Sequence, residues 1–218
     1  MLGPVLLIIG VFFLLFYFVM LCYFSFSKKK ERNSFLNSFP YQFYGDMSSL
    51  ERYFLYGLLC IGVFLVSLGE SIYFISMKSL LFVTLSVLFP LSLVFLLLSN
   101  LIPLSKYRLH IFFAMFSFAI FMFSSLLYGI SGWIEGGIVF KDSVSLFSRV
   151  VILVFGVLSL LSFVNPKLLD WPKMERSEVN GTTYYVKPKV NFLALYEWVY
   201  LLLQLVSGII FFANALIC

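Results

Sequence analysis

Long apolar runs separated by short polar segments organise this chain. Six runs each hold about 20 residues, the length that an α-helix needs to cross a hydrocarbon core of about 30 Å. The runs are continuous rather than alternating, so they indicate helices and not barrel strands. The expected spans are approximately residues 4–26, 53–76, 80–102, 109–130, 146–164 and 193–216. The pattern predicts an all-α, polytopic membrane bundle of six transmembrane helices, forming a single domain over residues 1–218.

Composition agrees with a lipid environment. The chain is 62% hydrophobic and only 11% charged, whereas a soluble domain carries about 25% charged residues. The net charge of +5 does not indicate nucleic acid as a partner, because the basic residues lie in short loops where they set membrane orientation. No cofactor is expected. The three cysteines, Cys22, Cys60 and Cys218, have neither pairing nor metal-ligand spacing.

The basic residues predict an orientation. Twelve of the fifteen Lys and Arg residues fall in the loops at 28–52, 100–108 and 165–190. Positive loops stay on the cytoplasmic side, so these three loops are predicted to be cytoplasmic and both termini to be outside. The expected location is integral and multi-pass, in a plasma membrane or an endomembrane.

Several polar residues gather near the membrane face that holds these loops. The single histidine, His110, opens the fourth span, and Asp46, Asn100 and Glu197 lie at the same level. Unmet polar groups at the rim of an apolar bundle are costly. We therefore expect His110 to bond Glu197, Asp46 or Asn100, and Trp198 to line the same recess.

The chemistry open to His110 is limited. Zinc needs three or four ligands, and a lone histidine without a cysteine cluster offers no metal site. Two roles remain: a structural histidine at a helix end, or a general base with Glu197 or Asp46 as its acid partner. No nucleophile elbow, Walker loop, dinucleotide fingerprint or zincin motif occurs, so no catalytic residue is assigned.

The second candidate feature is an ion pair near the opposite face. Glu70 lies near the end of the second span, and Arg149 opens the fifth. A charge inside a membrane span seeks a partner, which predicts a Glu70–Arg149 pair. The alternative is that both side chains reach the interface separately.

Four sequence pieces together resemble one family. They are FPYQFYGDMSSLERYFLYG before the second span, Ser99-Asn100 followed by HIFFAMFSF, FSRVVIL at the fifth span and ALYEWVYLL at the sixth. In this order they resemble the autophagy-modulator (DRAM) and FGF-receptor-activating-protein superfamily of six-helix membrane proteins, which has prokaryotic relatives of unknown function. The resemblance implies recurrent polar positions at Asp46, Asn100, His110, Arg149, Glu197 and Trp198. The usual orientation of that family puts the loops at 28–52 (loop one) and 165–190 (loop five) outside. The distribution of basic residues predicts the opposite orientation.

Three functions follow as hypotheses. The resemblance implies a lipid-associated regulatory or accessory protein. Its expected partners are membrane lipids and a partner membrane protein. A lipid headgroup or a partner helix would bind at the face that holds His110, Glu197, Trp198, Asp46 and Asn100. The first alternative is a small transporter or channel, although mid-span residues are nearly all apolar apart from serines. The second is a lipid-modifying enzyme that uses His110 with an acid.

Overall fold

The computed structural model describes residues 2–27, 43–44, 47–102, 106–134, 143–164, 175–179, 182–186 and 192–217. The helices are α1 (Leu2–Ser27), α2 (Ser49–Ser76), α3 (Leu80–Leu101), α4 (Tyr107–Ile134), α5 (Ser143–Val164) and α7 (Phe192–Ile217). Among the described residues, five helices, all but α5, are long and apolar enough to cross a membrane. The apolar part of α5 is shorter, Leu146–Leu161. A helical fold with five helices that could cross a membrane is therefore confirmed for the described residues, and it is compatible with a multi-pass membrane protein.

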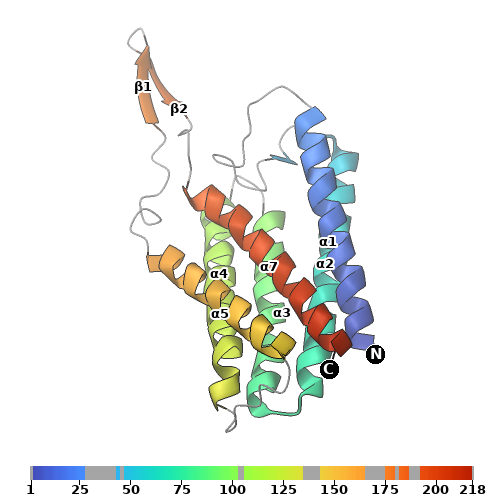
Figure 1. The fold of residues 1–218 in the computed structure, drawn as a ribbon. Coiled ribbons are helices and arrows are strands. Elements are labelled where there is room, and N and C mark those ends of the chain that lie inside the picture. The colour runs from blue at the N-terminus through green and yellow to red at the C-terminus, as the bar shows by residue number, and fades with distance from the viewer. Residues whose placement is uncertain are drawn as a thin grey trace.

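The helices run alternately up and down (Figure 1). Consecutive helices from α1 to α5 contact one another, and α7 closes the bundle against α1, α2 and α5. The described ends of the chain lie at the same end of the bundle (Figure 1). Consequently α1 and α3 finish at the end where α2, α4 and α7 begin, so the polar candidates from different spans come together there; α5 lies obliquely beside α7 (Figure 1).

A short antiparallel hairpin precedes α7. Strands β1 (Glu175–Val179) and β2 (Thr182–Val186) pair with Glu175 opposite Val186 and Val179 opposite Thr182. The hairpin projects beyond the helices (Figure 1), so it adds an extramembrane element to an otherwise helical fold.

Local sequence signals explain where α2 begins and ends. Ser48 accepts a hydrogen bond from the Glu51 backbone and Glu51 Oε2 accepts one from the Ser48 backbone, which forms a capping box. A tight turn at residues 77–79 follows, because α2 ends at Ser76 and α3 begins at Leu80. Lys78 in that turn has a positive φ of 57°.

Pro90 lies inside α3, and the helix continues through it. Proline lacks the N–H that would bond the carbonyl four residues earlier, at Ser86. Ser71 of α2 supplies the missing donor, with its Oγ 2.8 Å from the Ser86 carbonyl oxygen. Within a bilayer such replacement matters, because water cannot satisfy the freed carbonyl. This bond also fastens α2 to α3.

Glycines set the close approach of α1 to α2. A Cβ on Gly69 would lie 2.7 Å from Leu7 Cγ, and one on Gly62 would lie 2.7 Å from Leu14 Cδ2. A Cβ on Gly57 would meet nothing within 4 Å. Two of the three glycines of α2 therefore permit helix contact, which requires small residues where helices approach closely in lipid.

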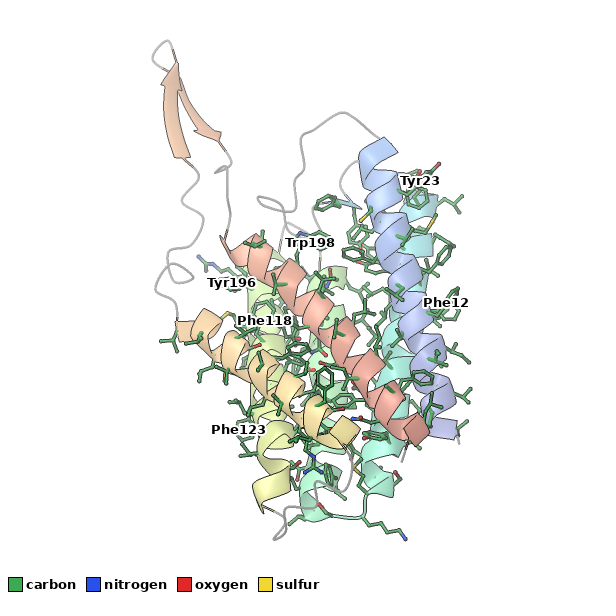
Figure 2. The ribbon with its side chains drawn as sticks, in the orientation of Figure 1. Phe12, Tyr23, Phe118, Phe123, Tyr196 and Trp198 are labelled. Carbon is green, nitrogen blue, oxygen red and sulfur yellow. The ribbon has the colours of Figure 1, made fainter. Side chains whose placement is uncertain are left out.

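The aromatic side chains lie in two environments, the buried core and the outer surface of the bundle. Phe74, Phe89, Tyr128 and Phe211 form a buried cluster joining α2, α3, α4 and α7, with ring centroids of Phe211 5.0 Å from those of Phe74 and Phe89. Others, such as Phe12 and Phe123, point away from the bundle (Figure 2). The high aromatic content thus reflects core packing and a lipid-facing surface.

Candidate functional site

His110 joins three helices where the candidates meet. Its Nε2 lies 3.0 Å from Oε1 of Glu197 at the start of α7. Its Nδ1 lies 2.6 Å from the carbonyl oxygen of Ser99 near the end of α3. The prediction that His110 bonds Glu197, Asp46 or Asn100 is confirmed through Glu197. His110 is 1% exposed and Glu197 3%, so the pair is enclosed in protein.

The geometry limits the protonation of this pair. A carbonyl oxygen can only accept, so His110 Nδ1 carries a proton and donates it to Ser99. One further proton then lies between Nε2 and Oε1. It belongs either to an imidazolium facing a carboxylate or to a carboxylic acid facing a neutral imidazole. Both arrangements are neutral as a whole, which suits a buried site.

The other residues predicted at this face differ in whether they lie near His110. Asn100 is buried, and its Nδ2 donates to the Leu96 carbonyl 2.9 Å away, within its own helix. Trp198 is buried, with its ring edge-on to Phe18 at 5.7 Å and to Phe43 at 5.3 Å. Asp46 lies outside the described residues. The structure therefore brings His110 and Glu197 together and places Trp198 one residue further along α7.

Described residues of loop one cover this end of the bundle. Phe43 and Tyr44 are buried, and the Tyr44 hydroxyl lies 2.6 Å from the Tyr17 hydroxyl of α1. Burial raises the pKa of the Tyr44 phenol well above its ordinary value, so this group stays protonated and can donate. Loop one is thereby fastened to α1 and, through Phe43, to Trp198.

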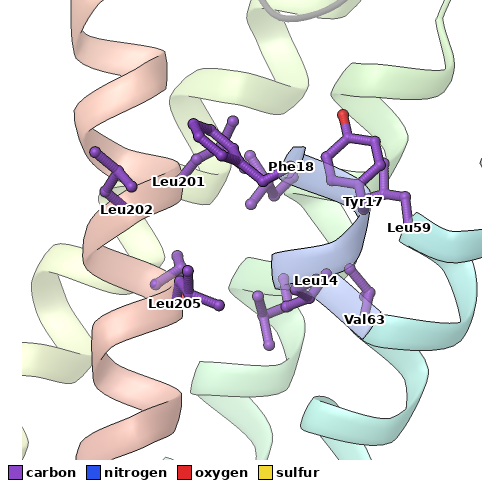
Figure 3. Close-up of a pocket in the computed structure, with 11 residues that line it drawn as sticks. Leu14, Tyr17, Phe18, Leu59, Val63, Leu201, Leu202 and Leu205 are labelled. Carbon is purple, nitrogen blue, oxygen red and sulfur yellow. The ribbon is translucent and has the colours of Figure 1, made fainter. Parts of the chain in front are cut away.

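A groove opens between α1 and α7, one turn beyond Trp198. It is narrow and partly open to the outside, with a cavity volume of about 30 Å³. In Figure 3, Leu14 and Phe18 of α1 lie across the groove from Leu202 and Leu205 of α7. Its lining is apolar apart from Tyr17 and Gln204: Leu14, Tyr17, Phe18, Leu59, Val63, Leu93, Leu96, Leu201, Leu202, Gln204 and Leu205. We call this feature the α1–α7 groove.

The buried face of α7 is polar, which the sequence analysis missed. The residues on it are Glu197, Tyr200, Gln204, Ser207 and Asn214, all buried. We call them the α7 polar stripe. Their spacing of three, four, three and seven residues matches one face of a helix. That spacing was the available signal, because polar residues on one face of an otherwise apolar span are expected to point inward.

The middle of this stripe is held by hydrogen bonds to α3 and α4. Gln204 Nε2 donates to Tyr200 Oη at 2.7 Å and to Ser92 Oγ at 2.8 Å. Ser117 Oγ donates to the Ser92 carbonyl at 2.6 Å, and Tyr200 Oη donates to the Ser117 carbonyl at 2.7 Å. The mid-span region is therefore more polar inside than the sequence suggested, yet most of its groups have partners.

A second polar contact lies nearer the other end. Asn214 Nδ2 donates to Tyr128 Oη at 3.1 Å, and Ser148 Oγ donates to Asn214 Oδ1 at 2.6 Å. These bonds connect α7 to α4 and α5. Interhelical bonds of this kind stabilise membrane bundles, because lipid offers no alternative partner.

The predicted Glu70–Arg149 pair is wrong. Glu70 is fully buried, and within the described residues neither of its carboxyl oxygens has a hydrogen-bond partner. The Nε of Arg149 likewise has none there. Arg149 is half-buried on α5, whereas Glu70 is fully buried on α2, whose neighbouring residues Val66 and Tyr73 pack against α7. Nearness to the same membrane face did not put the two side chains together.

No group of three or more His, Cys, Asp or Glu side chains that could hold a metal ion occurs in the described part of the chain. The His110–Glu197 pair has the composition of an acid–base pair, but neither residue lines the α1–α7 groove. What the arrangement offers chemically is an enclosed proton-sharing pair, an apolar groove beside it and an unpartnered acid in the bundle interior.

Comparison with known proteins adds no family. No protein-family model matches the chain, and no curated protein or solved structure matches it either. The conclusion that the structure itself supports is a multi-pass helical membrane protein with a polar interior face on α7.

Proposed function

We propose that this chain is a six-span, lipid-associated membrane protein of regulatory or accessory type, whose α1–α7 groove binds the acyl chain of a membrane lipid. Helix α5 is the sixth span: its 22 residues extend about 33 Å at the rise of an α-helix. The alternating direction of the helices supports six crossings, since the first and last described residues lie at one end of the bundle (Figure 1).

The observation that carries this proposal is the groove itself. It lies between two membrane-spanning helices, has an almost wholly apolar lining and is partly open. An empty groove forfeits the dispersion contacts of its lining. In a bilayer the nearest group that can restore them is a lipid acyl chain, so the groove favours a lipid over a water-soluble ligand.

The hydrophobic effect does not drive this binding. A lipid tail is already in hydrocarbon, so it gains only packing contacts and any polar contact on entering the groove. Gln204 lines the groove, but its Oε1 is buried beneath the groove surface, so the groove offers a lipid tail packing contacts and no polar contact.

His110 and Glu197 act in this proposal as a clamp rather than as headgroup ligands. Both ring nitrogens of His110 already have protein partners, and the ring is buried. The clamp fixes the start of α7 against α3 and α4, and so fixes one wall of the groove. An enzymatic role would require this pair to open toward a substrate.

Photo-crosslinking tests the groove. The chain is reconstituted with a phospholipid that carries a diazirine on its acyl chain, and crosslinked peptides are identified by mass spectrometry. Crosslinks should concentrate on α1 and α7 at groove positions. Leu205→Trp, which fills the groove, should reduce them several-fold, whereas Val206→Trp, at an exposed neighbouring position outside the groove lining, should leave them unchanged. Equal crosslinking in all three proteins would contradict the proposal.

A transporter is the second candidate, and the α7 polar stripe is the observation in its favour. An ion pathway needs polar groups that face water. The hydrogen bonds of Tyr200 and Gln204 are made to protein, and the aromatic cluster around Phe211 fills the interior below them. These contacts favour a closed bundle over an open conduit.

A further inference from the structure

Glu70 is the ionisable group in the bundle interior that the clamp and the groove do not use. It lies on α2, two turns before the helix ends at Ser76. Its side chain is 0% exposed, and neither Oε atom has a hydrogen-bond partner within the described residues. Intramembrane acids are rare and usually mark a functional site. The protonation state of this carboxyl group therefore bears on function.

The neighbours of Glu70 can be named from each helix beside it. On α2, Val66 and Tyr73 lie one turn to either side of Glu70. A Cβ on Gly208 of α7 would lie 3.8 Å from Val66. The Tyr73 ring stacks on Phe211 of α7, with 6.0 Å between the ring centroids. Glu70 therefore faces α7.

No described Lys, Arg or His side chain lies within ion-pair distance of Glu70. On α3, the Ser86 carbonyl accepts from Ser71, and Phe89 stacks on Phe74. On α1, Leu7 and the Gly3 backbone lie close to Gly69. These groups carry no charge. An ionised Glu70 would thus be an uncompensated charge in an apolar interior.

We propose that Glu70 is a proton-binding site in the interior of the bundle, occupied by a proton at neutral pH. A proton is the ligand that fits, because one carboxyl suffices to hold it. A metal ion would need several further ligands, and none of the required clusters occurs in the described residues. The neutral acid can donate to an acceptor that lacks a donor.

Such acceptors lie on the same helix face and on α7. Ser67 Oγ, one turn before Glu70, and Gln204 Oε1 are buried atoms that lack hydrogen-bond partners in the described structure. Neither atom is hydrogen-bonded to Glu70 in the structure. Glu70 faces α7, which carries the polar stripe, and Glu197 of that stripe shares a proton with His110. A protonated Glu70 and the neutral His110–Glu197 pair then add no net charge to the interior.

Infrared spectroscopy of the full chain in lipid nanodiscs tests the protonation directly. A protonated carboxyl has a carbonyl stretching band that shifts in heavy water, and exposed acids, with pKa values of about 4, lack it at neutral pH. Glu70→Gln should remove such a band. The matched control is Glu51→Gln, in the solvent-facing capping box of α2, which should remove carboxylate bands instead. Loss of carboxylate bands in Glu70→Gln would overturn the proposal.

A stability measurement gives an independent reading. Gln is close to Glu in size and neutral, so Glu70→Gln should leave the melting temperature in detergent unchanged or raised at neutral pH. Glu70→Ala, which leaves a cavity, should lower it. A melting temperature lowered as much by Gln as by Ala would mean that the charge of Glu70 stabilises the fold, and the proposal would be wrong.

Discussion

At the scale of single residues, the clamp formed by His110 is the most consequential contact. It fastens the end of α3, the start of α4 and the start of α7 through two hydrogen bonds. Each of these helices begins or ends beside a loop, so their mutual positions depend on such contacts. Breaking one side of a buried pair costs more than removing both sides, because the remaining group is stranded.

His110→Ala should therefore destabilise the bundle by about 1–3 kcal/mol, since it leaves Glu197 buried without its imidazole partner. The change should be seen as a lower melting temperature in detergent, with membrane insertion retained. Combining it with Glu197→Gln should cost less than the sum of the two single changes. Additive losses in this double-mutant cycle would mean that the two side chains do not support one another.

Glu70 and Arg149 give the opposite expectation. They share no hydrogen bond or ion pair in the structure, so Glu70→Gln and Arg149→Leu should have additive effects on unfolding, within about 0.5 kcal/mol. Non-additivity above about 1 kcal/mol would restore the ion pair that the sequence predicted.

At the scale of elements, close approach between helices rests on a few glycines. Gly69→Ala should destabilise the bundle because its Cβ would lie 2.9 Å from the Leu7 backbone nitrogen, and backbone cannot move aside cheaply. Gly57→Ala is the matched control on the same helix, with open space around it. It should be neutral or stabilising by up to about 1 kcal/mol, since Ala favours a helix. Equal melting temperatures for the two variants would contradict the packing.

The helices themselves were predictable from apolar run length, and so was the capping of α2 by Ser48. Which side chains meet inside was less predictable. Glu197 and His110 could be placed at one membrane face because each opens a span, and they do meet. Glu70 and Arg149 also share a face, yet they do not meet, because helix rotation decides which way a side chain points. The polar stripe of α7 is predictable from the spacing of its residues, which places them on one face of the helix.

Residue depth and residue direction are thus separate pieces of information. Apolar run length gives depth, to within a few residues. The direction of a side chain is predicted from the spacing of the polar residues in a span. In α7 five buried polar residues give such a spacing. In α2 a single acid carries no period. The unpartnered state of Glu70 could not be foreseen without the positions of α7 and α3.

At the scale of the whole molecule, the proposed six crossings and the charge distribution together make a prediction about sidedness. Helices α1 and α3 finish at the end of the bundle where α2, α4 and α7 begin (Figure 1). The sequence segments that lead into α2, α4 and α7, at 28–52, 100–108 and 165–190, carry most of the basic residues. We expect this end to be cytoplasmic. The resembled family has the opposite orientation, so the two expectations can be separated by labelling.

The labelling experiment uses a chain in which the three native cysteines, Cys22, Cys60 and Cys218, are replaced by serine. Each variant then carries one new cysteine, through Ser34→Cys, Thr183→Cys or Gly136→Cys. In intact cells, an impermeant thiol reagent should leave the first two unmodified and should modify the third; permeabilised cells supply the control that all three can react. Modification of the first two with protection of the third would establish the orientation usual for the resembled family. Opposite results for Ser34→Cys and Thr183→Cys would have a different meaning. The two positions would then lie on different sides, so α5 would not cross the membrane, and the sixth span would be lost.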